Sequence, residues 1–141
     1  MSEGRGTNHP FECIGAPWLD SDEVVGYMNS LGFEGVKFRP YHFTPTFSKH
    51  KGELCHGIQL HITDYRTFTP FEVGLCLVDH IRQVYPEFRF KQPESNGHIH
   101  MDDVFGSAEF RRDDFDVEAY LARQAEKLAQ YEQAIKPYYI Y

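Results

Sequence analysis

The chain has 141 residues, of which 14 are Lys or Arg and 21 are Asp or Glu, so its formal net charge is −7. This length suits one ordinary domain with a single core. The acidic balance argues against a nucleic-acid partner, because affinity for the phosphate backbone comes mostly from clustered cations. No stretch is long and apolar enough to predict a membrane span.

The three cysteines, Cys13, Cys55 and Cys76, are widely spaced and odd in number. This pattern predicts neither a disulfide framework nor a structural zinc site. We expect small buried thiols, and we expect neither a metal nor another cofactor. Reduced thiols agree with a cytoplasmic protein and equally with a periplasmic or secreted one, so the sequence leaves the compartment unknown.

Residues 2–7 (SEGRGT) open the chain with a polar segment that contains two glycines and has no apolar periodicity. The segment brings the Glu3 carboxylate, the Arg5 guanidinium and the Thr7 hydroxyl into one loop. Such a loop is typical of part of a site, whose other half would lie before residue 1.

Two strands are expected between the first two helices, over about 36–43 and 54–63. If they pair, one face is apolar and the other presents Lys37, Arg39, Gln59 and His61 together. A solvated sheet face and a surface that meets a ligand or another domain both remain open. Gly57 in mid-strand indicates the close approach of another group.

Three helices are expected, over about 20–31, 70–85 and 116–136, with a short helical turn at 101–105. Asp20 and Glu23 form a capping-box-like pair, and Thr69-Pro70 marks the second helix start. The expected buried stripes are Phe71, Leu75, Val78, Ile81 and Tyr85 in the second helix and Val117, Leu121, Leu128, Tyr131 and Ile135 in the third.

The remaining elements are a strand at 88–91 and a closing strand at 137–141. The order strand, helix, strand favours a right-handed crossover if the strands are parallel. We therefore expect an α+β fold with α/β-like local order. It consists of a small mixed sheet, helices mainly on one face and a long C-terminal helix, in a single domain over 1–141.

Two further patterns carry chemistry. His98, His100 and Asp102 resemble the start of a His-x-His-x-Asp-His zinc pattern, but residue 103 is Asp, which favours an ordinary loop that enters a helix. An aromatic group near the first long strand, Trp18, Tyr41, Phe43 and Phe47, suits stacking on a sugar ring. Most of the aromatic residues are nevertheless expected in the core.

The motifs SEGRGT at 2–7, IGAPW at 14–18, GVKFRP at 35–40, FTPTFSK at 43–49 and GELC at 52–55, followed by GIQLH at 57–61, share an order with a known family. Together they resemble the C-terminal half of the NamZ-type exo-β-N-acetylmuramidases, formerly a domain of unknown function. The resemblance covers nearly the whole chain and is specific through residue 63. It implies a bacterial two-domain parent, periplasmic or secreted in location, with a muramic-acid site between the domains.

By this resemblance the proposed catalytic carboxylate belongs to a larger, Rossmann-like N-terminal domain that this sequence does not include. The chain would be the substrate-cleft domain of a glycoside hydrolase that removes terminal N-acetylmuramic acid from peptidoglycan. Residues 1–10 would form the interdomain junction. The expected partners are that N-terminal domain and a muropeptide or muramic-acid glycoside.

The resemblance implies no catalytic residue in this chain, with Glu3 the single carboxylate considered, so the chain alone should be inactive or nearly so. Arg5 or Arg39 would pair with the lactyl carboxylate. A non-catalytic cell-wall sugar-binding module, a protein-interaction module and a small zinc hydrolase remain as alternatives. The expected substrate-binding residues are Glu3, Arg5, Thr7, Arg39, Gln59 and His61.

Overall fold

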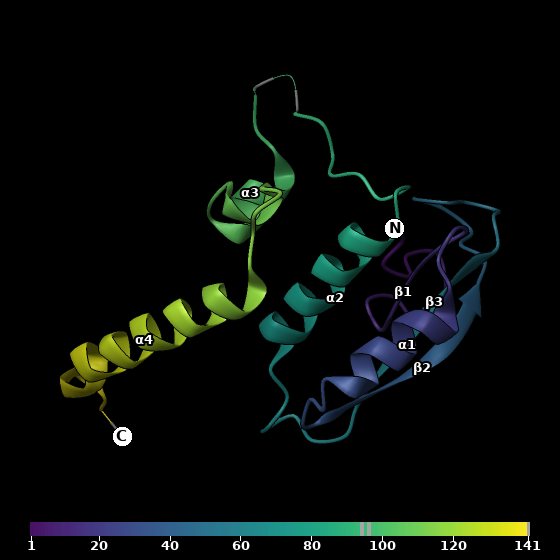
Figure 1. The fold of residues 1–141 in the computed structure, drawn as a ribbon. Coiled ribbons are helices and arrows are strands. Elements are labelled where there is room, and N and C mark those ends of the chain that lie inside the picture. Colours follow the sequence, from purple (N-terminus) through teal and green to yellow (C-terminus); the bar gives the residue numbers. More distant parts are fainter. Residues whose placement is uncertain (94, 96, 141) are drawn as a thin grey trace. The chain divides into compact units, whose positions relative to one another are not determined.

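The computed structural model describes residues 1–93, 95 and 97–140 (Figure 1). The chain forms two compact units, Met1–Arg89 and Phe90–Tyr141. The elements in chain order are β1 (Cys13–Ala16), α1 (Ser21–Ser30), β2 (Val36–Phe43), β3 (Cys55–Ile62), α2 (Pro70–Val84), α3 (His100–Phe105), a 3₁₀ turn (Glu109–Arg111), α4 (Val117–Ile135) and a second 3₁₀ turn (Lys136–Tyr138).

The first unit is built on a three-stranded sheet in the order β1-β3-β2, and both pairings are antiparallel. β2 and β3 form where the sequence predicts them, and the α+β fold class with a long C-terminal helix is confirmed. β1 is not predicted by the sequence, because four residues are too few to show alternation.

The expected strand at 88–91 is wrong, and the sheet contains no parallel pair among the described residues. The backbone N–H of Phe88 donates to the Tyr85 carbonyl at 3.0 Å, so the chain turns at Pro86 instead of extending. The crossover that the sequence order suggested therefore does not form.

α1 and α2 cover one face of the sheet (Figure 1). α1 begins at its predicted place because the Asp20 carboxylate accepts hydrogen bonds from the backbone N–H groups of Asp22 and Glu23, at 3.0 and 3.2 Å. Each fully buried aliphatic side chain in this core contributes about 1.5–3 kcal/mol of transfer free energy. The buried core comprises Ala16, Leu19, Val24, Met28, Val36, Phe38, Ile58, Val73, Leu77 and Ile81.

The buried stripe of α2 agrees with the predicted one only in part. Leu75 and Ile81 are buried as predicted, whereas Phe71 is 55% exposed. The residues that enter the main core are Val73, Leu77 and Ile81, spaced four apart. Phe71 precedes Val73 by two residues, which places it on nearly the opposite side of the helix.

β2 is an edge strand, and the Asn29 side chain binds its outward-facing backbone groups at Phe38. The Asn29 amide donates to the Phe38 carbonyl at 3.0 Å and accepts from the Phe38 N–H at 3.3 Å. Two residues further along the same edge, Pro40 has no N–H to offer. α1 is thus fastened to the outer edge of β2 by a pair of hydrogen bonds.

The opposite face of the sheet carries a smaller cluster at one end, formed by Cys13, Phe43 and Cys55 with Tyr41 packed against it. Burial raises the pKa of both thiols, so they stay protonated at neutral pH. A Cβ placed on Gly57 would clash with the Ile14 carbonyl and lie 2.6 Å from the backbone of the facing glycine of β1. The close approach expected at Gly57 is therefore made by β1.

The second unit has an aromatic core. α3 and α4 form as predicted, and Phe105, Phe110, Phe115 and Tyr120 have ring centroids 4.9 to 6.0 Å apart. The buried stripe expected for α4 is wrong in its second half. Along that helix only Tyr120 is buried, and Leu128 and Tyr131 are 57% and 61% exposed within the described chain.

The tyrosine-rich end does not form the expected closing strand. Lys136–Tyr138 is a 3₁₀ turn, and Tyr138, Tyr139 and Ile140 are all well exposed, while Tyr141 lies outside the described residues. Pro137 is suited to such a turn, because its ring fixes φ near helical values. Across the described residues, no helix combines the length and apolar character needed to cross a bilayer.

Candidate functional site

Glu3 lies at the centre of one charged group of the predicted site. One carboxylate oxygen lies 3.1 Å from Arg5 Nε in an ion pair, and the other accepts a hydrogen bond from Lys49 Nζ at 2.9 Å. Burial raises the pKa of the Glu3 carboxyl. The Lys49 hydrogen bond, a backbone hydrogen bond and the charges of Lys49 and Arg5 together outweigh that effect and lower the pKa. Glu3 is therefore an ionised partner of two cations at neutral pH.

The loop that carries Glu3 is held in place by backbone bonds. Ser2 forms an isolated antiparallel bridge with Gly15 of β1, and the Gly6 carbonyl accepts from both the N–H and the hydroxyl of Thr46. The Thr7 hydroxyl donates to the Gly4 carbonyl at 2.7 Å and accepts from a backbone N–H at 3.1 Å. Thr7 thus shapes the turn of this loop.

Arg39 and Gln59 form a second group on the sheet face away from α1 and α2. They are direct cross-strand partners, and the Gln59 side-chain oxygen accepts from Arg39 Nε at 3.0 Å and from Nη2 at 2.6 Å. Gln59 is only 4% exposed, so its amide is a fixed support for the guanidinium. The Arg39 guanidinium also lies 5.8 Å from the Tyr41 ring centroid.

No carboxylate pairs with Arg39 among the described residues. The partner that orients its guanidinium is a neutral amide, so the positive charge stays uncompensated at short range. His61 and Lys37 are the next cross-strand pair on the same face, and both are exposed. This arrangement can receive an anionic group, because an oriented guanidinium matches a carboxylate in two hydrogen bonds.

The structure therefore brings Glu3 to Arg5 and Arg39 to Gln59, but it forms no hydrogen bond or ion pair between these two groups within the described chain. His9 connects the two regions, since its ring meets Tyr41 edge-on with centroids 5.8 Å apart. Sequence reasoning missed Lys49 as the partner of Glu3. No local pattern could have indicated that contact, because the two residues are 46 positions apart.

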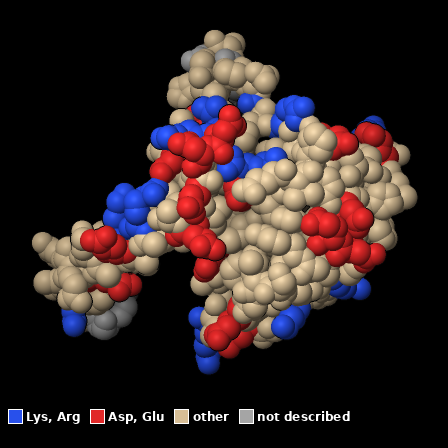
Figure 2. Space-filling view, viewed as in Figure 1, with Lys and Arg blue, Asp and Glu red and all other residues tan. Residues whose placement is uncertain are grey.

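On the face shown in Figure 2, the Lys and Arg atoms lie in small groups between acidic ones.

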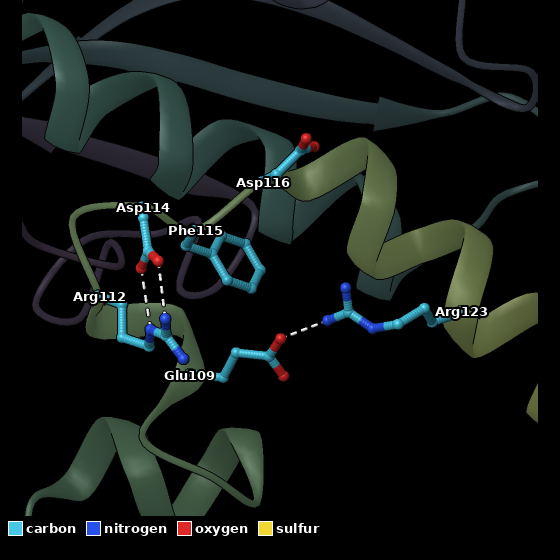
Figure 3. Close-up of a pocket in the computed structure, with 6 residues that line it drawn as sticks. All are labelled: Glu109, Arg112, Asp114, Phe115, Asp116 and Arg123. Atoms are coloured by element: carbon cyan, nitrogen blue, oxygen red, sulfur yellow. Dashed lines mark hydrogen bonds and ion pairs between the residues drawn. The ribbon is translucent and has the colours of Figure 1, made fainter.

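The second unit contains a polar hollow of about 210 Å³ (Figure 3). Both of its arginines are paired with carboxylates of the lining: Arg112 makes two hydrogen bonds to Asp114, at 2.8 and 2.7 Å, and Arg123 pairs with Glu109. Asp116 caps α4 by accepting from the Ala119 N–H at 3.0 Å. A hollow whose arginines are paired internally offers little attraction to an anionic ligand.

The possible zinc ligands do not converge. Asp102 is paired with Arg111 through both carboxylate oxygens, at 2.5 and 2.6 Å. His98 makes a different contact, in which its Nδ1 atom lies 3.3 Å from Asp103 Oδ1. The described residues contain no group of three or more His, Cys, Asp or Glu side chains able to hold a metal ion.

Comparison with known proteins decides the family. The whole chain, residues 1–141, matches the family model described as exo-β-N-acetylmuramidase NamZ, C-terminal. The chain belongs to the NamZ C-terminal family. The expected family resemblance is thereby confirmed.

Two relatives of this chain are longer proteins. The chain is 41% identical over 145 residues to the peptidoglycan β-N-acetylmuramidase NamZ of Bacillus subtilis, covering all of this chain and 34% of that protein. It also matches the crystal structure of a DUF1343 family protein from Bacteroides fragilis, with a TM-score of 0.82 and 28% identity, covering all of this chain and 38% of the other. The chain thus spans about a third of the length of these relatives.

Proposed function

We propose that this chain is the substrate-cleft domain of a peptidoglycan exo-β-N-acetylmuramidase, a glycoside hydrolase that removes terminal N-acetylmuramic acid. Residues 1–10 would join it to an N-terminal catalytic domain, and the ligand would be a muropeptide or muramic-acid glycoside. The observation that carries the proposal is Arg39. Its guanidinium is oriented by a buried neutral amide and has no carboxylate partner among the described residues.

Arg39, rather than Arg5, is our candidate for binding the lactyl carboxylate of muramic acid. Arg5 is already paired with the Glu3 carboxylate, so a second carboxylate there would be repelled by the first. Arg39 keeps its charge available while Gln59 fixes its orientation. His61 and Lys37 lie beside this pair and would add further donors to a bound sugar acid.

We expect the isolated chain to lack the groups needed to hydrolyse a glycoside. Glycoside hydrolysis normally uses two positioned carboxyl groups, of which the general acid needs a raised pKa. Glu3 has the opposite environment, because Lys49 and Arg5 help to lower its pKa. We propose that Glu3 fixes the junction loop and that the acid comes from the N-terminal domain, so the isolated chain should be inactive.

The direct test is a chimera in which this chain replaces the C-terminal third of the Bacillus subtilis relative. We expect the chimera to hydrolyse a chromogenic N-acetylmuramic acid glycoside and the isolated chain to release no chromophore. Robust turnover by the isolated chain would contradict the assignment of the acid to another domain. An inactive chimera that folds and is stable would contradict the cleft role itself.

Two matched variants of the chimera separate the arginines. Arg39→Met should raise KM by about 10-fold or more, as expected for loss of a charge-assisted hydrogen bond. Arg5→Met should change KM by less than about 3-fold, since it removes an exposed ion pair. The reverse order would assign the carboxylate to Arg5.

A non-catalytic cell-wall sugar-binding module is the second candidate, and the observation that favours it is that the Arg39–Gln59 pair is complete within this chain. Calorimetry with N-acetylmuramic acid distinguishes the two. Micromolar affinity of the isolated chain would favour the binding module, and no detectable binding would favour a site completed by another domain.

A further inference from the structure

A second hollow, of about 430 Å³, lies where α1 begins. Its walls come from the segment before α1, the first turn of that helix, and two histidines of β2 and β3. In the strand alternation these histidines belong to the face covered by α1 and α2, opposite to Arg39 and Gln59. The hollow is therefore separate from the proposed carboxylate site. Its main lining residues are Trp18, Asp20, Ser21, Asp22, His42 and His56.

Trp18 gives this hollow an aromatic wall. It is the single tryptophan of the chain, and it packs partly against the main core, with its ring centroid 5.6 Å from that of Tyr85. The indole is therefore held by its neighbours while it lines the hollow. A fixed aromatic ring next to polar groups suits a pyranose, whose C–H groups stack on the ring and whose hydroxyls form hydrogen bonds.

The two histidines supply hydrogen-bonding groups. His42 and His56 are direct cross-strand partners, and their Nδ1 atoms lie 3.0 Å apart, so one ring donates to the other. This bond fixes both rings and uses one nitrogen of each. Neither Nε2 atom has a hydrogen bond within the described chain, so each can bond to a ligand hydroxyl.

The wall of the hollow at the start of α1 offers a ligand few hydrogen bonds. The Asp20 carboxylate already occupies the backbone N–H groups of Asp22 and Glu23. Ser21 also lines the hollow, but it is 6% exposed and its hydroxyl oxygen is buried, so a ligand hydroxyl does not reach it. Hydrogen bonds to a ligand are therefore expected from the rings of His42 and His56.

The charge of the hollow selects among ligands. Asp20 and Asp22 contribute carboxylates, and no Lys or Arg lines it. Carboxylates accept hydrogen bonds from sugar hydroxyls but repel anions. We propose that this hollow binds an uncharged pyranose sugar, through stacking on Trp18 and hydrogen bonds to His42 and His56.

The single tryptophan makes the test direct. Titration of the 141-residue chain, in buffer with a chelator, with N,N′-diacetylchitobiose or cellobiose should shift the Trp18 emission in a saturable way. The dissociation constant should be on the order of 1 mM, or about −4 kcal/mol. N-acetylmuramic acid, which is anionic, should leave the emission unchanged over the same range. The absence of a saturable change with both neutral sugars, or an equal response to N-acetylmuramic acid, would overturn the proposal.

Variants locate the binding. His42→Ala and His56→Ala should each weaken binding of the neutral sugar about 10-fold, as expected for lost hydrogen bonds. His50→Asn, which removes a histidine outside the hollow, should bind as the unaltered chain does. Unchanged affinity in both His42→Ala and His56→Ala would overturn the proposal.

A folding control accompanies these titrations. The thermal midpoint of each variant, measured by circular dichroism, identifies any protein that has lost its fold, and the other variant then carries the test. Because the readout is sugar binding by the chain itself, its result does not depend on whether the chimera hydrolyses a muramic-acid glycoside.

Discussion

The two faces of the sheet place the same strands in different surroundings. Beneath α1 and α2 the face is hydrocarbon, and Ile58 is completely buried there. The other face has a small cluster at one end and the Arg39–Gln59 pair beyond it, with Gln59 only 4% exposed. Ile58 and Gln59 are consecutive and almost equally buried. The contacts of a side chain, more than its burial, therefore distinguish a core position from one that we propose supports binding.

The largest loss of stability should come from substitution of Gly57, where the backbone of β1 lies closest to β3. In Gly57→Val the new side chain would collide with the backbone of β1, which cannot move away without loss of the β1–β3 pairing. We expect destabilisation of about 4 kcal/mol or more, measured by urea unfolding.

Gly26→Ala is the matched control, because Gly26 lies inside α1 and nothing would lie within 4 Å of the new Cβ. It should stabilise the protein by about 0.5–1 kcal/mol. Equal destabilisation by the two substitutions would remove the close approach of β1 as the cause.

A substitution on the hydrocarbon face should have the next largest effect. Ile58→Ala leaves a cavity in the core and should cost about 3 kcal/mol of unfolding free energy. Ile62→Ala, at a position of the same strand that is 57% exposed, should cost less than about 1 kcal/mol. Similar losses of unfolding free energy for the two variants would mean that α1 and α2 do not shield this face from water.

The polar face should respond in binding more than in stability. Gln59→Met keeps the volume of the side chain but removes the oxygen that orients Arg39. In the chimera we expect about 10-fold higher KM for a muramic-acid glycoside, with a stability change of about 1 kcal/mol. A large loss of stability with unchanged KM would make the Arg39–Gln59 pair structural.

The smallest effect should be a pH-dependent one at Glu3. Its pKa is lowered on folding, so its stabilising contribution is present above the unfolded pKa of about 4.3 and is lost as the pH falls through the folded value. Glu3→Gln should therefore reduce stability by about 0.5–1 kcal/mol at neutral pH.

In strong acid the difference between Glu3→Gln and the unaltered chain should vanish, as followed by urea unfolding across pH. Glu34→Gln, at an exposed position, should show little difference at any pH. A difference for Glu3→Gln that persists in acid would point to lost packing instead of lost charge.

The elements with a clear period could be predicted from the sequence. Strand alternation placed Arg39 and Gln59 on one face, and their direct pairing follows from the register of β2 and β3. Asp20 indicated the start of α1, because an N-cap residue lies next to the helix that it caps and can be recognised in the sequence. Long-range features escaped prediction: β1 is too short to show a period, and the Glu3–Lys49 bond joins distant segments. The exposed half of α4 was mispredicted because an apolar stripe does not reveal whether another element covers it.

The amide of Asn29 on the outer side of β2 has a consequence for the behaviour of the protein at high concentration. A bare edge strand is a template onto which a strand of another molecule can add, and such addition begins many aggregates. Asn29 occupies both backbone groups of Phe38, and Pro40 offers no donor at the next outward position. At the β2 edge, these two residues thus hinder the addition of a fourth strand from a neighbouring molecule.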